Sequence, residues 1–136
     1  GTASAGAEKV ELRKIIGGSE ALAMQATVRR VESGKKANTC AIRLILATHP
    51  AGNDGSESIK RYLRYGSSPR GVQALILGAK VRALLDGQDH VEPPHIAAVA
   101  KQILNHRLIV NFEGESEQIM PETLIEEAIA KLELVS

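Results

Sequence analysis

One short segment combines residue types that could bind an anion. Ser68, Pro69 and Arg70 stand in a row before a long apolar stretch, and Gln73 follows one helical turn later. Serine is a favourable N-cap and proline suits the first helical position, so the spacing predicts a helix that begins at Pro69. The amino end of a helix attracts anions, and an arginine there adds a planar fork that can donate two hydrogen bonds to a phosphate. The segment is therefore a candidate phosphate-binding site.

Arg70 also breaks a local rule of helix stability. It falls in the first turn, where the positive end of the helix dipole disfavours a cation. A rule that is broken without visible compensation indicates a functional position. The competing interpretation is a solvated surface arginine, and spacing alone favours that interpretation because short motifs are weak signals.

A second group of chemistry-bearing side chains is Asp89, His90, Glu92 and His95. Its spacing matches no established metal site and two prolines stiffen the segment, so solvated side chains are the preferred interpretation and no metal site is predicted. Cys40 falls within a predicted helix, near its apolar face. We expect a buried small hydrophobe there rather than a nucleophile.

The parts of a phosphate-transferring enzyme are missing from this sequence. A P-loop needs GxxxxGK[ST], and the nearest string, Ser33-Gly34-Lys35-Lys36, lacks both the upstream glycine and the hydroxyl after lysine. A Walker B segment needs an apolar strand that ends in acidic residues, whereas residues 83–87 have one acid and end a helix. This chain alone is therefore expected neither to bind a cofactor nor to hydrolyse ATP.

The elements that must position these residues are helices. Apolar periodicity predicts about six of them, with no alternation of strand and helix. The expected ranges are 7–16, 21–31, 36–48, 69–86, 93–106 and 121–134. On the third, Ala41, Leu44, Ile45 and Thr48 should share one face, and Pro50 should end it.

The remaining segments are expected to be irregular. Residues 1–6 are small and polar, and are interpreted as a disordered lead or a cloning remnant. The stretch 49–58 should be a loop, and the type of 58–65 is left open. Residues 108–112 should be extended, with a minor extended pair near Val91 and Leu108, and residues 114–120 should form a loop.

Composition excludes several classes of protein. The 136 residues carry a net charge of +1 and only 2% aromatic residues. Net charge this close to zero drives no binding to nucleic acid or to anionic lipid. With so few aromatic residues, the core must be aliphatic. A single cysteine forms no intrachain disulfide, and no apolar run reaches transmembrane length, so a cytoplasmic protein is expected.

The central run RYGSSPRGVQALILGAKVRALLDGQDHV resembles the lid of MoxR-family AAA+ ATPases, in which a Gly-Ala-Ser-Pro-Arg segment opens a long helix. The resemblance extends back through VRRV and AIRLILATHP and forward through ILNHRLIVNFEGESE. Three departures are Ser67 in place of alanine, His49 in place of arginine, and Glu92 where serine or threonine is commoner as a helix cap.

This resemblance implies an all-α domain, a helical bundle of the AAA+ lid type, over residues 7–136. Arg70 matches the sensor 2 arginine, which contacts the terminal phosphate of ATP, and Ser68, Pro69 and Gln73 would lie at the same cleft. ATP and Mg²⁺ would be held by an upstream α/β base domain absent from this chain. The resemblance further implies a homo-oligomeric ring, typically a hexamer, a chaperone-like remodelling activity, and von Willebrand factor A-domain proteins as partners.

Two other functions remain open at this point. A locally basic centre, which includes Arg61, Arg64 and Arg82, could belong to a DNA-binding module, although no helix-turn-helix pair is visible. The acidic final helix could serve a stand-alone protein-interaction module, although a solvated face explains the same charges.

Overall fold

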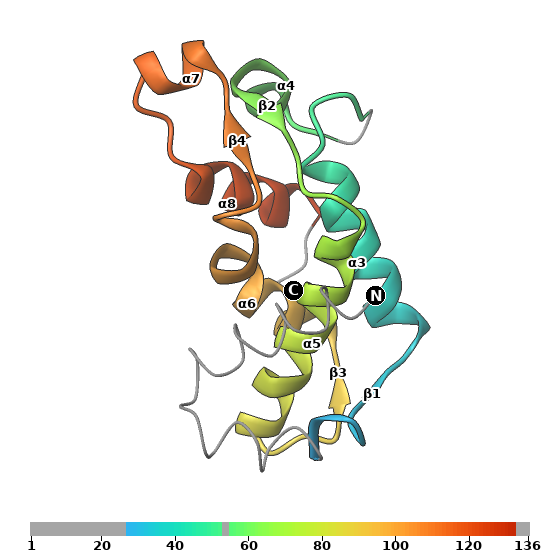
Figure 1. The fold of residues 1–136 in the computed structure, drawn as a ribbon. Coiled ribbons are helices and arrows are strands. Elements are labelled where there is room, and N and C mark those ends of the chain that lie inside the picture. Colours follow the sequence, from blue (N-terminus) through green and yellow to red (C-terminus); the bar gives the residue numbers. More distant parts are fainter. Residues whose placement is uncertain (1–26, 53–54, 133–136) are drawn as a thin grey trace.

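The computed structural model describes residues 27–52 and 55–132 as six helices and two short strand pairs (Figure 1). The expected lead 1–6, the expected helix 7–16 and most of the expected helix 21–31 lie outside the described residues. Where the second of these helices enters the described part, Thr27 and Val28 are helical and a turn follows, so the helix ends before Val31.

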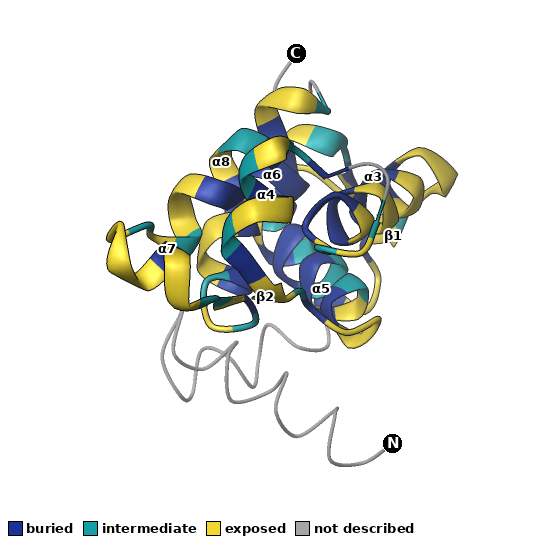
Figure 2. Ribbon diagram, turned by 90° about the horizontal axis from the view of Figure 1, so that it is seen from above, coloured by how far each residue is buried: buried dark blue, intermediate teal, exposed yellow. Residues whose placement is uncertain are grey.

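Four helices form the body of the domain, and their bounds are α3 (Lys35–Ala47), α5 (Arg70–Leu85), α6 (Pro93–Leu104) and α8 (Pro121–Lys131). Helix α5 packs mainly against α6 and also against α3, while α8 contacts both α6 and α3. Buried residues gather where these helices face one another (Figure 2). The core they form is aliphatic, as composition predicts, and the all-α fold class is confirmed.

Helix α3 follows its predicted pattern closely. Ala41, Leu44, Ile45 and Thr48 are all buried, as the helical spacing predicts. The buried Thr48 lies just after the helix, and its hydroxyl donates to the carbonyl oxygens of Leu44 at 3.2 Å and Ile45 at 3.0 Å. The end of α3 is therefore fixed by a side chain that also belongs to the core.

Helix α5 is turned slightly from the predicted orientation. Leu75, Ala79 and Ala83 are buried as expected, but Val72 and Ile76 are only half-buried. Small residues on the adjoining side, Gly71, Ala74 and Gly78, are buried in their place. Close packing against α3 and α6 thus selects the small-residue side of the helix. Gly87, at a φ of +76°, follows the C-cap Asp86, consistent with the predicted helix end.

The extended segments pair differently from the prediction. Strand β1 (Glu32–Ser33) lies parallel to β3 (His90–Val91), and β2 (Leu63–Tyr65) lies antiparallel to β4 (Ile109–Val110). Val91 thus belongs to one strand pair and Leu108 lies next to the other. The prediction of a single extended pair near these two residues is therefore wrong. Figure 1 shows the two pairs at opposite ends of the helical body.

Two short helices lie in segments that the sequence pattern either does not assign or predicts to be irregular. Helix α4 (Glu57–Tyr62) precedes β2 and is capped by Ser56, whose hydroxyl accepts from the Ile59 amide at 3.2 Å. Helix α7 (Phe112–Ser116) follows β4. The sequence pattern predicts an extended Phe112 and a loop over residues 114–120. This prediction is wrong for Phe112–Ser116, which are helical.

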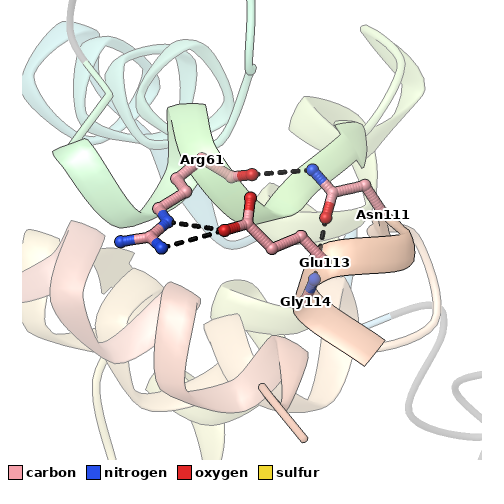
Figure 3. A network of polar contacts seen from close by, with 4 residues as sticks. All are labelled: Arg61, Asn111, Glu113 and Gly114. Atoms are coloured by element: carbon pink, nitrogen blue, oxygen red, sulfur yellow. Dashed lines mark hydrogen bonds and ion pairs between the residues drawn. The ribbon is translucent and has the colours of Figure 1, made fainter. Parts of the chain in front are cut away.

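The cap of α7 explains that local difference (Figure 3). The Asn111 side chain accepts from the Gly114 amide at 2.8 Å and donates to the Arg61 carbonyl at 2.7 Å. Arg61 in turn donates to one carboxylate oxygen of Glu113, from Nε at 3.0 Å and from the terminal nitrogen at 2.9 Å. Contacts from α4, far away in sequence, therefore hold α7 in place.

Candidate functional site

The predicted site residues lie together at the start of α5. The segment 66–69 connects β2 to this helix, and Ser68, Pro69, Arg70 and Gln73 are all exposed. Gln73 follows Arg70 by three residues of α5, which places the two side chains on adjoining faces of the helix one turn apart. The structure thus gathers the four residues into one accessible patch.

The helix begins one residue later than predicted. Pro69 is the N-cap rather than the first helical residue, and no side-chain cap hydrogen bond forms at this helix start. Ser68 contributes its carbonyl oxygen instead, which accepts from the Gly71 amide at 2.8 Å. The predicted capping role of the Ser68 side chain is therefore wrong. Arg70 becomes the first residue of α5, where backbone amides have no partner within the helix.

The electrostatics of this patch favour an anion. Within residues 27–52 and 55–132, the Arg70 guanidinium has no hydrogen-bond or ion-pair partner. Its charge adds to the positive end of the α5 dipole rather than opposing it. A phosphate oxygen placed here would meet both a planar donor fork and a favourable helix end.

The side of the segment that faces the core contains residues that the sequence did not single out. Ser67 is 2% exposed, and its hydroxyl donates to the Ser68 carbonyl at 3.2 Å. Gly66 lies against the end of α3, because a Cβ on it would come within 2.6 Å of the Thr48 carbonyl oxygen. Gly71 is buried in the same way against Ser67 and Ile45. A glycine directly after Arg70, inside a helix, is the signal that could have identified this contact.

Farther along α5, an open groove of about 250 Å³ continues from Gln73. The described residues that line it are Val72, Gln73, Ile76, Leu77 and Lys80. Gln73 therefore separates the polar start of the helix from an apolar surface.

The histidine and acidic residues near α6 are engaged with one another. His90 Nδ1 lies 3.1 Å from Asp89 Oδ1 and His90 Nε2 lies 3.0 Å from Glu92 Oε1. The hydrogen bond with Asp89 and the negative charges of Glu92 and Asp89 raise the pKa of His90 and, in return, His90 lowers the pKa of Asp89. Among the described residues, no group of three such side chains is arranged to hold a metal ion.

Cys40 is buried in α3, as predicted from the helical pattern. Burial raises the pKa of its thiol, while the charge of Arg43 acts in the opposite direction. A protonated, enclosed thiol behaves as a small hydrophobe.

None of the helices that the structure describes is both long enough and apolar enough to cross a bilayer.

Comparison with known proteins identifies the class to which this fold and this helix start belong. The family model of the AAA lid domain matches residues 56–128, more than half of the chain. The chain therefore belongs to the AAA lid domain family.

Similar proteins indicate which group of AAA lid domains this chain resembles. Chaperone MoxR1 of Mycobacterium tuberculosis is 29% identical over 93 residues, which make up 68% of this chain and 25% of MoxR1. Protein MoxR of Methylorubrum extorquens is 36% identical over 69 residues, 49% of this chain and 20% of that protein. Together with the family match, these relatives place the domain among the lid regions of MoxR-family AAA+ ATPases.

A solved structure shows the same fold. The crystal structure of a proposed ATPase from Cytophaga hutchinsonii superimposes with a TM-score of 0.76 at 32% sequence identity. The match covers 86% of this chain and 36% of that one. This chain thus spans about a quarter of MoxR1 and about a third of the solved chain.

Proposed function

We propose that this domain is the C-terminal lid of a MoxR-type AAA+ ATPase and that Arg70 is its sensor 2 arginine. In this proposal an upstream base domain with a P-loop holds Mg-ATP, and residues 7–136 close over the nucleotide. Arg70 contacts the terminal phosphate and couples the state of the nucleotide to movement of the lid.

One observation carries the proposal: Arg70 is exposed at the first position of α5 and has no partner among the described residues. A solvated surface arginine would satisfy the same geometry. The membership of the AAA lid domain family favours the functional interpretation, because the matched residues 56–128 include the whole start of α5.

Each neighbour of Arg70 has a distinct part in this proposal. The Ser67-to-Pro69 connection sets the direction from which α5 starts, and Ser68 and Pro69 line the approach to the phosphate. Gln73 offers an amide to the same cleft from the next turn. During hydrolysis the Arg70 guanidinium would stabilise charge that grows on the terminal phosphate in the transition state, because it donates through a fork of fixed geometry.

The wider assembly follows from the family and is part of the proposal. We expect the full-length protein to form a homo-oligomeric ring in the cytoplasm. By analogy with other AAA+ proteins, this ring should be a hexamer. Its cycle of ATP hydrolysis would drive chaperone-like remodelling together with von Willebrand factor A-domain proteins. The name of one relative, Chaperone MoxR1, supports the chaperone-like part of this proposal.

The test is Arg70→Ala in the full-length ATPase. Loss of a donor to developing charge should lower turnover by about a hundredfold, with little effect on folding because Arg70 is exposed. Arg70→Lys should recover only part of the loss, since an ammonium lacks the planar fork. Arg82→Ala is the matched control: Arg82 lies on the same helix, roughly 18 Å away at 1.5 Å per residue, and pairs with Asp86.

Two results would contradict the proposal. Turnover and nucleotide affinity could remain unchanged in Arg70→Ala while the melting temperature falls, which would make Arg70 a structural residue. Alternatively, the purified 136-residue chain could hydrolyse ATP at a rate that a substitution within it abolishes, which would mean that it contains its own catalytic machinery.

A further inference from the structure

The backbone that carries Arg70 is in close contact with the end of α3. A Cβ on Gly71 would overlap Ser67 Oγ and would come within 2.8 Å of Ile45 Cδ1. Both neighbours are buried, since Ser67 is 2% exposed and Ile45 is 5% exposed, so a methyl group at residue 71 would meet packed side chains and not solvent. With a side chain at residue 71, either the first turn of α5 or the side chains of Ser67 and Ile45 would have to shift.

A second contact fixes the segment at its other end. The virtual Cβ of Gly66 would lie 2.6 Å from the Thr48 carbonyl oxygen and 3.1 Å from His49 Cα. Both of these are backbone atoms, and Thr48 is itself fully buried. The segment that carries Arg70 is therefore held at both ends. Gly71 contacts Ile45 of α3, and Gly66 contacts Thr48 and His49, which follow α3.

We propose that Gly71 is a positioning residue for Arg70: by letting the first turn of α5 rest on Ser67 and Ile45, it sets where the guanidinium lies relative to the rest of the lid. This inference rests on the proposed function of Arg70. Glycine weakens a helix relative to alanine, so its presence in this turn calls for a reason other than helix stability. The overlap with Ser67 supplies that reason.

The same contacts define a compensating change. Ser67→Ala removes the hydroxyl oxygen that a methyl group at residue 71 would meet, and Ile45→Val removes Cδ1. Both substitutions make the side chain smaller without adding a polar group to the core. Gly71→Ala combined with them should therefore return the first turn, and Arg70 with it, close to its original position.

The experiment measures ATP turnover, KM and melting temperature in the full-length ATPase. Gly71→Ala should lower kcat by up to about a hundredfold, because a displacement of about 1 Å can cost that much. The triple variant Ile45→Val, Ser67→Ala, Gly71→Ala should recover most of that loss. Gly78→Ala is the matched control, because Gly78 lies on the same helix as Gly71. A methyl group there crowds Ile103 and Val99 of α6 but leaves the first turn of α5 untouched.

A double-mutant cycle with Arg70→Ala separates positioning from stability. If Gly71 acts through Arg70, adding Gly71→Ala to Arg70→Ala should lower kcat no further. Independent, multiplying losses, or a triple variant as slow as Gly71→Ala, would overturn the inference while leaving the role of Arg70 intact. If Arg70→Ala alone had no effect on turnover, the proposed function would fail first and the inference with it.

Discussion

The backbone amide of Glu92 donates a hydrogen bond to Nδ1 of His95 at a distance of 2.9 Å. Glutamate is an unfavourable N-cap by itself, and this contact shows how α6 nevertheless begins directly after it. His95, at the third helical position, reaches back to the cap residue in the way that a glutamate or glutamine does in a capping box.

The first prediction concerns this cap. His95→Ala should lower the free energy of unfolding by about 1–2 kcal/mol, because it leaves the Glu92 amide without its acceptor and removes a 7%-exposed side chain. His95→Gln keeps an acceptor of suitable reach and should retain most of the stability. Urea unfolding of the two variants checks this, and equal losses would contradict the capping role.

The second prediction concerns pH. The raised pKa of His90 means that folding favours its protonated form, held between Asp89 and Glu92. That stabilisation is fully present below the ordinary value of 6.5 and is lost as pH rises through the raised pKa of the folded state. His90→Gln should therefore be less stable than the parent at about pH 5.5 and equal to it at about pH 8.5. A gap that is the same at both pH values would show that His90 acts through packing.

The third prediction compares two large side chains. Phe112, the single phenylalanine, is 84% exposed, whereas Leu75 is fully buried. Phe112→Ser should change the free energy of unfolding by less than about 0.5 kcal/mol, while Leu75→Ala should cost about 2–5 kcal/mol through lost burial and a cavity. Thermal and chemical unfolding would both report the difference. A costly Phe112→Ser would indicate that α7 packs against the body of the domain through this ring.

The fourth prediction ranks the contacts that hold α7. Arg61 and Glu113 form an ion pair whose side chains are 59% and 50% exposed, so solvent weakens the pair and Arg61→Ala should cost less stability than Asn111→Ala. Asn111→Ala should cost about 1–2 kcal/mol, since it removes the cap of α7 and the bond to the Arg61 carbonyl together. Unfolding free energies in high salt sharpen the comparison, because only the ion pair is screened.

Sequence reasoning succeeded where the controlling forces are local. The apolar spacing of α3 identified its buried face, and the proline and glycine signals located both ends of α5 to within about one residue. The grouping of Ser68, Pro69 and Arg70 was also visible because the three residues are consecutive, while their role toward a nucleotide stays a prediction.

It failed where a distant segment decides the structure. The side chain that caps helix α7, Asn111, is also bonded to the carbonyl of Arg61, fifty residues earlier in the chain, and no periodicity predicts that contact. The two-residue strands are too short to show alternation, so their partners could not be assigned. The contact of Gly71 with Ile45 is likewise a matter of how two helices pack, and the sequence alone shows only a glycine in an unusual place.

The single cysteine can report local opening of this domain. Cys40 is 5% exposed, and burial raises the pKa of its thiol, so the closed structure offers a reagent little access and little thiolate. An alkylating reagent can therefore modify the thiol only through openings that release α3, at a rate set by how often such openings occur and by the reactivity of the free thiol. Because no other cysteine is present, the uptake of one label per chain follows the loosening of the helix on which the Arg70 turn rests, without any engineered probe.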